Sequence, residues 1–157
     1  MNAHTPRRAS AGFSLVEMLV AMGLIAGVLL AVAGLFLKGH QQTDSGRNSS
    51  TALAVGHAVM EELQGGSFSR PWTLFGDGGA ASTLDIDSRS DAAAAAWQAE
   101  LVRGQLNDPR VEIHLESLVD SGLAPPLAGA QAIRIRVIVF WKEGRRDRKV
   151  RLVTVRT

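Results

Sequence analysis

The feature that most limits how this chain can fold is a long apolar segment near its N-terminus. Residues 13–37 form a run of 25 residues with a single charge, Glu17. About 20 predominantly apolar residues are enough for a helix to cross the hydrocarbon core of a bilayer. We therefore expect residues 13–37 to form a transmembrane helix, which leaves room for only one small domain in a chain of 157 residues.

A short polar leader precedes this apolar segment. Residues 1–12 (MNAHTPRRASAG) contain Arg7 and Arg8 and have no apolar stretch of their own. Positive charge in front of a membrane span favours a cytoplasmic N-terminus. The sequence therefore predicts a single-pass protein of the cytoplasmic (inner) membrane whose C-terminal part is exported.

The segment after the apolar run is expected to continue the helix outside the membrane. Residues 52–64 carry an apolar stripe at helical spacing, and the glycines at 65 and 66 should end the helix. Residues 38–51 are polar on every side and contain Gly39 and Gly46. Each glycine costs a helix roughly 1 kcal/mol relative to alanine. Whether residues 38–51 are helical is left open.

The first part of the remaining chain is rich in turn residues. Residues 67–90 are interpreted as a loop with a short strand at 83–86. A helix is predicted over residues 92–103, capped by Ser90 or Asp91. Its buried face should include Trp97 and Leu101, which lie four residues apart.

Three later segments alternate apolar and polar residues, which is typical of strands. They lie at residues 111–115, 133–141 and 150–155, and the last two are expected to form a hairpin around Gly144. Together they predict an antiparallel sheet that covers the second half of the long helix. The expected fold class is α+β. The expected organisation is a leader (1–12), a transmembrane and assembly helix (13–37), its exported half (38–64) and a globular head (65–157).

A short motif at the start of the apolar run is more specific than its hydropathy. The residues Gly12-Phe13-Ser14-Leu15-Val16-Glu17 follow the basic leader and open the apolar run. This arrangement resembles the cleavage and assembly motif of the type IV pilin family, which includes the pseudopilins of type II secretion. The resemblance covers about residues 7–37.

The resemblance implies how the chain is processed and assembled. In that family a membrane prepilin peptidase cuts after the glycine and methylates the new amine, here between Gly12 and Phe13. The glutamate that becomes fifth in the mature chain, here Glu17, neutralises the Phe13 amine of a neighbouring subunit. The implied partners are the prepilin peptidase, other pilin or pseudopilin subunits and the inner membrane.

The chain departs from many major pilins of this family in two ways. Its apolar segment contains no proline, and its head contains no cysteine pair. A hairpin with Trp141 just before its turn looks like the minor pilin V and minor pseudopilin I proteins. The resemblance therefore implies a minor structural subunit of a type IV pilus or of a type II secretion pseudopilus.

An ordinary secretory signal peptide is the alternative interpretation of the N-terminus. Arg7 and Arg8 would be its basic region, and residues 18–30 its apolar region. Residues 31–33 (Ala-Val-Ala) have the form that signal peptidase accepts, so the mature protein would begin at Gly34. This alternative predicts a signal-anchored or secreted envelope binding module with no role in a filament.

Charge is strongly segregated along the chain. Residues 131–157 carry nine Lys and Arg against two acidic residues, whereas residues 13–130 carry six against thirteen. The basic end could be a solvated face paired with Glu112 and Glu116, a surface that docks on an acidic neighbour, or a DNA-binding surface. The candidate interaction residues at the hairpin are Arg145, Arg146, Arg148 and Lys149.

No motif for catalysis or cofactor binding is present, so we expect a non-enzyme without a cofactor. There is no HExxH, no complete GxSxG and no phosphate-binding loop, and the chain has no cysteine. Four aspartates could form a calcium site, but their spacing does not fit an EF-hand, and loop solubility and helix capping explain them. No metal is therefore expected. The four aspartates considered for calcium are Asp77, Asp85, Asp87 and Asp91.

Overall fold

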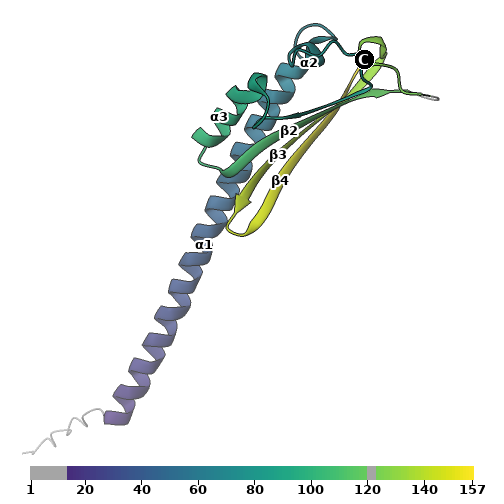
Figure 1. Ribbon diagram of the computed structural model, residues 1–157. Helices are drawn as coiled ribbons and strands as arrows, with labels where there is room; N and C mark the ends of the chain where they lie inside the picture. The colour runs from purple at the N-terminus through teal and green to yellow at the C-terminus, as the bar shows by residue number, and fades with distance from the viewer. Residues whose placement is uncertain (1–13, 120–122) are drawn as a thin grey trace, which may run out of the picture. The chain divides into compact units, whose positions relative to one another are not determined.

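A computed structural model describes residues 14–119 and 123–157 (Figure 1). The chain divides into two compact units, residues 1–43 and 44–157. Helix α1 (Leu15–Gln64) begins in the first unit and ends in the second. The second unit is referred to below as the head.

The described part of the first unit is helical from Leu15 onward, and its residues 15–37 are predominantly apolar. Every residue from 14 to 43 is exposed, including large side chains such as Leu24 and Phe36. An 18-residue window of α1 reaches a mean hydropathy of 2.6, and in the described part of the chain α1 is the one helix long and apolar enough to cross a membrane. The predicted transmembrane helix is confirmed as a helix of suitable length and composition.

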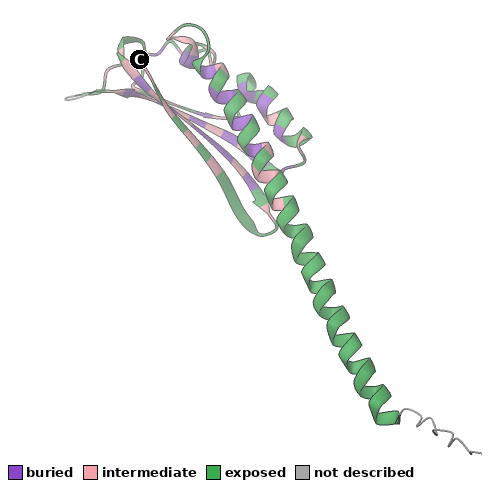
Figure 2. Ribbon diagram, turned by 180° about the vertical axis from the view of Figure 1, so that it is seen from behind, coloured by how far each residue is buried: buried purple, intermediate pink, exposed green. Residues whose placement is uncertain are grey.

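The head combines helices with one antiparallel sheet, as expected for an α+β fold. The sheet has the strand order β1-β2-β3-β4, so each strand pairs with its neighbour in sequence. The last part of α1 and helix α3 lie on the same face of the sheet (Figures 1 and 2). After α1 the elements are α2 (Arg70–Thr73), β1 (Thr83–Asp87), η1 (Ala92–Ala94), α3 (Ala95–Arg103), β2 (Asn107–Leu118), η2 (Leu127–Gly129), β3 (Ala132–Glu143) and β4 (Arg146–Arg156).

The alternation in the sequence places one face of the sheet in the core. Val111 pairs with Val139, Ile113 with Val137 and Leu115 with Ile135, and all six side chains are at most 1% exposed. Side chains that alternate with them point to the opposite face, because the side-chain period of a strand is two. The three predicted strands are confirmed. The short strand at 83–86 is also present and pairs with β2 as β1.

The end of α1 supplies the other side of this core. Its buried residues fall at helical spacing, as predicted for residues 52–64, and Figure 2 shows them on the side that faces the sheet. Gly56 permits a close approach, since a Cβ there would lie 3.0 Å from Cδ1 of Leu152. Gly66 has a φ of 74°, which fits the end of the helix at Gln64. The buried residues are Ala52, Val55, Gly56, Val59, Met60 and Leu63.

Residues 38–51, whose conformation the sequence left open, belong to α1. Within the head, Arg47 donates from Nη2 to Oε1 of Gln105 at 2.7 Å. Gly104 lies against the same turns of helix, because a Cβ on it would come within 2.5 Å of Cγ2 of Thr51. Contacts from the α3–β2 connection therefore support helix that is unfavourable on glycine content alone.

The expectation of an unstructured loop at residues 67–90 is wrong in part. The loop contains the short helix α2, in which Pro71 and Trp72 are buried. Proline suits the first turn of a helix because its missing N–H has no partner there. The helix predicted at 92–103 is present as η1 followed by α3, and the side chain of Asp91 caps it by accepting the N–H of Ala93 at 2.8 Å.

Candidate assembly surfaces

The start of α1 is built around Ser14. Its Oγ accepts the backbone N–H of Glu17 at 3.2 Å, and its carbonyl accepts the N–H of Met18 at 3.2 Å. This is an N-cap, and Ser14-Leu15-Val16-Glu17 has the sequence of a capping box. Sequence reasoning missed the role of Ser14, although the Ser-x-x-Glu spacing before an apolar run is a signal for it.

Glu17 lies in the first turn of the helix, where a negative charge complements the helix dipole. It is exposed, and it is followed by more than a turn of exposed apolar residues. The predicted cleavage residues, Gly12 and Phe13, lie outside the described residues. The structure therefore places Glu17, the predicted assembly residue, at the start of the apolar helix, in the turn that follows its cap.

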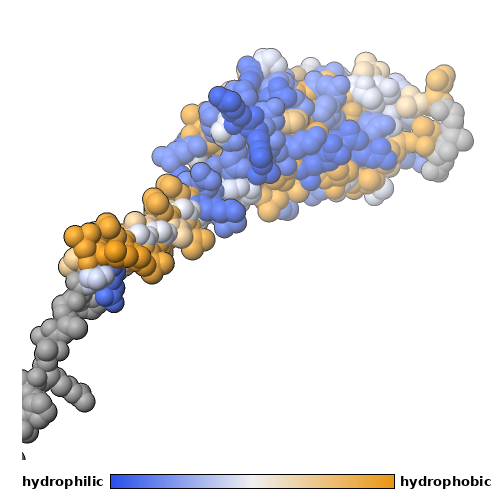
Figure 3. All heavy atoms as spheres, turned by 90° about the horizontal axis from the view of Figure 1, so that it is seen from below, coloured by the Kyte–Doolittle hydropathy of each residue, from blue (hydrophilic) through white to orange (hydrophobic). Residues whose placement is uncertain are grey.

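The surface of the first unit is apolar. Figure 3 shows hydrophobic residues gathered over the N-terminal helix, whereas much of the visible head surface is hydrophilic. Side chains such as Leu19, Ile25 and Leu29 are at least 60% exposed. Exposed apolar area on this scale marks a surface that contacts lipid or other protein.

Comparison with known proteins agrees with these features. Residues 7–34 match the model of the prokaryotic N-terminal methylation motif. No curated protein and no solved structure matches the chain.

The matched segment holds the two arginines of the leader, the predicted cleavage residues, Glu17 and most of the apolar run. The match supports a type IV pilin-like prepilin. The α+β fold, with a long apolar N-terminal helix and a four-stranded antiparallel sheet, is consistent with that class. A prepilin is processed by the prepilin peptidase and assembles with other pilin subunits.

The basic hairpin forms the second candidate surface. Arg145, Arg146 and Lys149 are exposed and have no ion-pair partner among residues 14–119 and 123–157. Arg148 instead donates from Nε to Oε2 of Glu143 at 2.8 Å. Hydrogen bonding from Ser45 and then from Arg148 lowers the pKa of Glu143. The hairpin therefore keeps several cations free for a partner.

The expected pairing of basic residues with Glu112 and Glu116 is correct for one of the two. Arg134 donates to Glu116 at 2.9 Å across strands β3 and β2. Glu112 pairs instead with Arg110 of its own strand, at 2.9 Å. His114 contacts Asp85 through Nδ1. A partly paired, solvated face is therefore present where Arg134 and Arg148 lie, whereas Arg145, Arg146 and Lys149 near the turn have no ion-pair partner among the described residues.

The aromatic residues near the hairpin are not free to stack on bases. Trp141 is 4% exposed and belongs to the core. The guanidinium of Arg110 covers the ring of Phe140, with Cζ 4.6 Å from its centroid. Single-stranded nucleic acid usually binds to open aromatic faces beside cations. This arrangement favours a protein partner over DNA for the basic surface.

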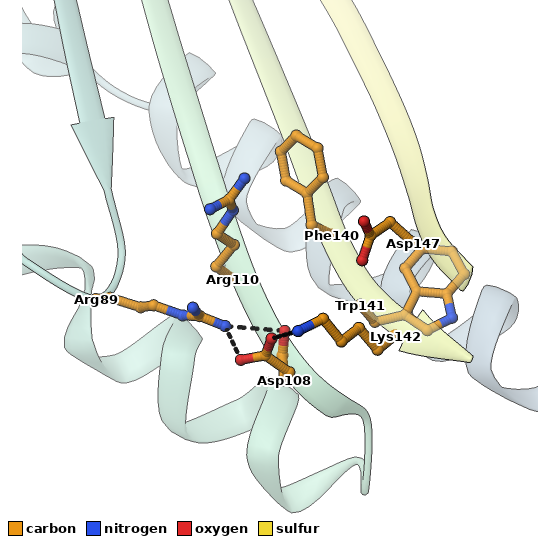
Figure 4. A pocket seen from close by; sticks show the side chains of 7 residues that line it. All are labelled: Arg89, Asp108, Arg110, Phe140, Trp141, Lys142 and Asp147. Atoms are coloured by element: carbon orange, nitrogen blue, oxygen red, sulfur yellow. Dashed lines mark hydrogen bonds and ion pairs between the residues drawn. The ribbon is translucent and has the colours of Figure 1, made fainter. Parts of the chain in front are cut away.

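A small polar cavity lies at the end of β2 nearest the hairpin turn. It has a volume of about 320 Å³ and is lined by Arg89, Asp108, Arg110, Phe140, Trp141, Lys142 and Asp147. Figure 4 shows Asp108 between Arg89 and Lys142, with Nζ of Lys142 2.7 Å from Oδ2. Lys142 and then Arg89 lower the pKa of Asp108, and Asp108 raises the pKa of Lys142.

These ion pairs fix an irregular piece of backbone. Asp108 has a φ of 49° and lies in a β-bulge between Asn107 and Arg110. A positive φ is unfavourable for a residue with a side chain. Because the carboxylate of Asp108 is already paired with both Arg89 and Lys142, the cluster is a structural brace for the bulge.

The aspartates considered as calcium ligands are used locally. Asp77 accepts the N–H of Gly79, Asp87 accepts the N–H of Arg89, and Asp91 caps η1. Asp85 contacts His114. Among the residues that the structure describes, no group of three or more acidic or histidine side chains could hold a metal ion. Their local roles are those expected of loop and cap residues.

Proposed function

We propose that this prepilin is a minor structural subunit of a type IV pilus or of a type II secretion pseudopilus, and not an enzyme. The observation that carries the proposal is the methylation motif at residues 7–34, followed by an exposed apolar helix that leads into a small sheet domain. The minor role is supported by two departures from many major pilins. The apolar helix lacks proline, and the head lacks a cysteine pair.

The membrane stage of the proposal is a single-pass protein in the inner membrane. The leader with Arg7 and Arg8 stays in the cytoplasm, and residues 38–157 are exported. Cleavage between Gly12 and Phe13 then leaves α1 as an apolar anchor from which the subunit enters the filament. Its exposed apolar side chains exchange lipid for the helices of neighbouring subunits.

Glu17 favours one axial position of the subunit relative to its neighbours. Two opposite charges about 4 Å apart attract by roughly 4 kcal/mol at an effective dielectric constant near 20. A carboxylate inside hydrocarbon costs about 2.5–3.5 kcal/mol on the insertion scale. Pairing of Glu17 with the Phe13 amine of a neighbour therefore offsets its desolvation, and a subunit in the wrong register lacks that compensation.

The N-terminus of the mature protein tests the processing step. Mass spectrometry of protein isolated from membranes should give a chain that begins at N-methylated Phe13. A chain that begins at Gly34 would instead support the secreted module, and an intact Met1 a simple anchor. Gly12→Val should leave the leader attached, because the new side chain occupies the position read by the peptidase. Gly23→Val, which lies within α1 and away from the cut, is the matched control.

Glu17→Val tests the assembly role separately from processing. Valine removes the carboxylate without shortening the apolar run, so insertion and cleavage should persist. The fraction of cleaved protein that sediments with filaments should fall strongly, and Glu17→Asp should give an intermediate value. Equal fractions for wild type and Glu17→Val would mean that Glu17 is only an interfacial residue.

A comparison of deletion phenotypes separates the two filament systems. Loss of twitching motility with normal secretion supports a pilus, and the reverse supports a pseudopilus.

The basic hairpin is proposed to dock on an acidic neighbouring subunit. Reversal of Arg145, Arg146 and Arg148 to Glu should weaken co-purification with filament partners in low salt and leave the fold intact. Co-purification at the wild-type level would reject docking. A gel shift of the full chain in detergent at two salt concentrations tests DNA binding, and a salt-sensitive shift would favour that alternative.

A further inference from the structure

The sheet of the head has two open edges of opposite chemistry. β4 forms one edge and has 11 residues, and β1 forms the other with five. The outer backbone groups of an edge strand are free to pair with another strand. Natural proteins usually protect such edges, so a long open edge calls for an explanation.

The side chains at the two edges are complementary in charge. Lys149 and Arg151 are exposed on the face of β4 that points away from the core, and neither has an ion-pair partner in the described ranges. On the corresponding face of β1 lie Asp85 and Asp87. The Asp85 side chain is 71% exposed although it contacts His114. One edge thus presents two cations and the other two carboxylates.

The topology allows these edges to meet between identical copies. Because the sheet has four strands and every neighbour is antiparallel, β1 and β4 run in opposite directions. Two copies that stand side by side in the same orientation therefore bring β4 of one against β1 of the other as an antiparallel pair. Subunits of a filament share such an orientation, and a contact of this head-to-tail kind does not close on itself.

Charge and packing select the same register for this pair. If Asp85 of the second copy stands opposite Arg151, then Asp87 stands opposite Lys149. On the core face of the sheet, Leu84 of the second copy then meets Leu152. Leu84 and Leu152 are both half-buried residues at the margin of the core, so the pair would cover apolar area that each edge leaves open.

A register without stagger gives less favourable side-chain pairs on both faces of the sheet. In the rows of a single sheet, Asp85 lies level with Val153 and Leu84 with Thr154. A straight continuation would therefore place a carboxylate against valine and leucine against threonine. A shift of two residues along β4 corrects both pairs and keeps each side chain on its face, because the strand period is two. Two residues correspond to about 7 Å along the strand.

We infer that two copies of this chain associate by adding β1 of one to β4 of the other, with Asp85 opposite Arg151. The stagger displaces each copy by about 7 Å along the strand, so repeated contacts generate a rise along a filament. This inference rests on the proposed role as a filament subunit and names one contact within it.

Single-cysteine variants test the register directly, since the natural chain has no cysteine. One full-length copy carries Asp85→Cys, and a differently tagged copy in the same cells carries Arg151→Cys. Mild oxidation of membranes with copper phenanthroline should give a heterodisulfide between the tags. The pair Asp85→Cys with Val153→Cys, which matches the unstaggered register, should give at least about threefold less, because the stagger separates these two positions by about 7 Å along the strand, beyond the usual reach of a disulfide.

An intrachain pair guards against a false negative. Arg136 and Val153 are partners in the β3–β4 register, so Arg136→Cys with Val153→Cys in one chain should oxidise readily. Equal yields from the two intermolecular pairs, or no heterodisulfide from either, would overturn the inference. Cleavage at Gly12 and sedimentation with filaments are scored on the same samples. Variants that are processed and incorporated but form no heterodisulfide would refute this contact and leave the proposed function standing.

Discussion

The two parts of helix α1 are helical for different reasons. Residues 15–43 are exposed on every side and owe nothing to a packed core. Residues 44–64 carry a buried stripe, in which Ala52, Val59 and Leu63 are 0% exposed. An apolar segment without a buried face has all its backbone hydrogen bonds inside the helix, as a bilayer requires. Residues 44–64, in contrast, need the sheet to cover their buried stripe.

This difference shows that a helix can be stabilised either by lipid and neighbouring helices or by a packed surface of its own chain. In the first part the partner is lipid or a neighbouring apolar helix, so residues 15–37 are predominantly apolar on every side of the helix. In the second part the partner is a fixed surface of the same chain, so only one stripe is apolar. Substitutions in the buried stripe of residues 44–64 should therefore change the stability of the head, whereas substitutions in residues 15–43 should not.

The largest expected effect contrasts one leucine from each part. Leu63→Ala removes a side chain that is 0% exposed and should destabilise the head by about 2–5 kcal/mol. Leu24→Ala, at a position 67% exposed, should leave the stability of the head unchanged. Thermal unfolding of the full chain in detergent, followed by circular dichroism, gives both Tm values. A loss of similar size in the two variants would break the comparison.

A second contrast concerns the contact that supports residues 44–51. Gly104→Ala places a Cβ about 2.5 Å from Cγ2 of Thr51, which forces the α3–β2 connection away from α1. We expect a loss of about 1–3 kcal/mol, typical of overpacking. Gly129→Ala is the control, because a Cβ there meets nothing within 4 Å. An unchanged urea midpoint for Gly104→Ala would show that this contact does not support the helix.

A smaller effect of opposite sign is expected in the same stretch of helix. Gly46 lies inside α1, and a Cβ on it would meet nothing within 4 Å. Gly46→Ala should therefore stabilise the head by up to about 1 kcal/mol. The urea midpoint should rise. A fall in the urea midpoint would mean that close packing requires glycine at this position, although a Cβ on Gly46 meets nothing within 4 Å in the structure.

The smallest effect is expected from acid, and it should be confined to the head. The pKa of Asp108 is lowered from 3.8 by Lys142 and Arg89, so its contribution is present above that value and is lost as the pH falls through the folded pKa. Asp108→Asn should be less stable than wild type at pH 7 and should lose less between pH 5 and pH 3. Parallel urea midpoints across that range would contradict the assignment.

Much of this fold follows from periodicity in the sequence. Alternation at 111–115 and 133–141 predicts the central strands because a single buried face admits only one register. The motif around Gly12 and Glu17 predicts the class because it combines several independent features.

Other features depend on contacts that periodicity does not encode. The helix at residues 44–51 is supported by Gln105 and Gly104, which are more than fifty residues away in sequence. The positive φ of Asp108 is a tertiary effect of its two cations. The cap at Ser14 could have been predicted from Ser-x-x-Glu, whereas the pairing of Glu112 with Arg110 instead of a β3 residue could not.

The placement of the tryptophans has a spectroscopic consequence. Trp72, Trp97 and Trp141 are the three in the chain, all are at most 7% exposed, and the chain has no tyrosine. Nearly all intrinsic ultraviolet fluorescence therefore originates in the interior of the head, and the membrane helix is optically silent. A shift of the emission maximum to longer wavelength will report the opening of the head in intact membranes, without a label and without a contribution from the anchor.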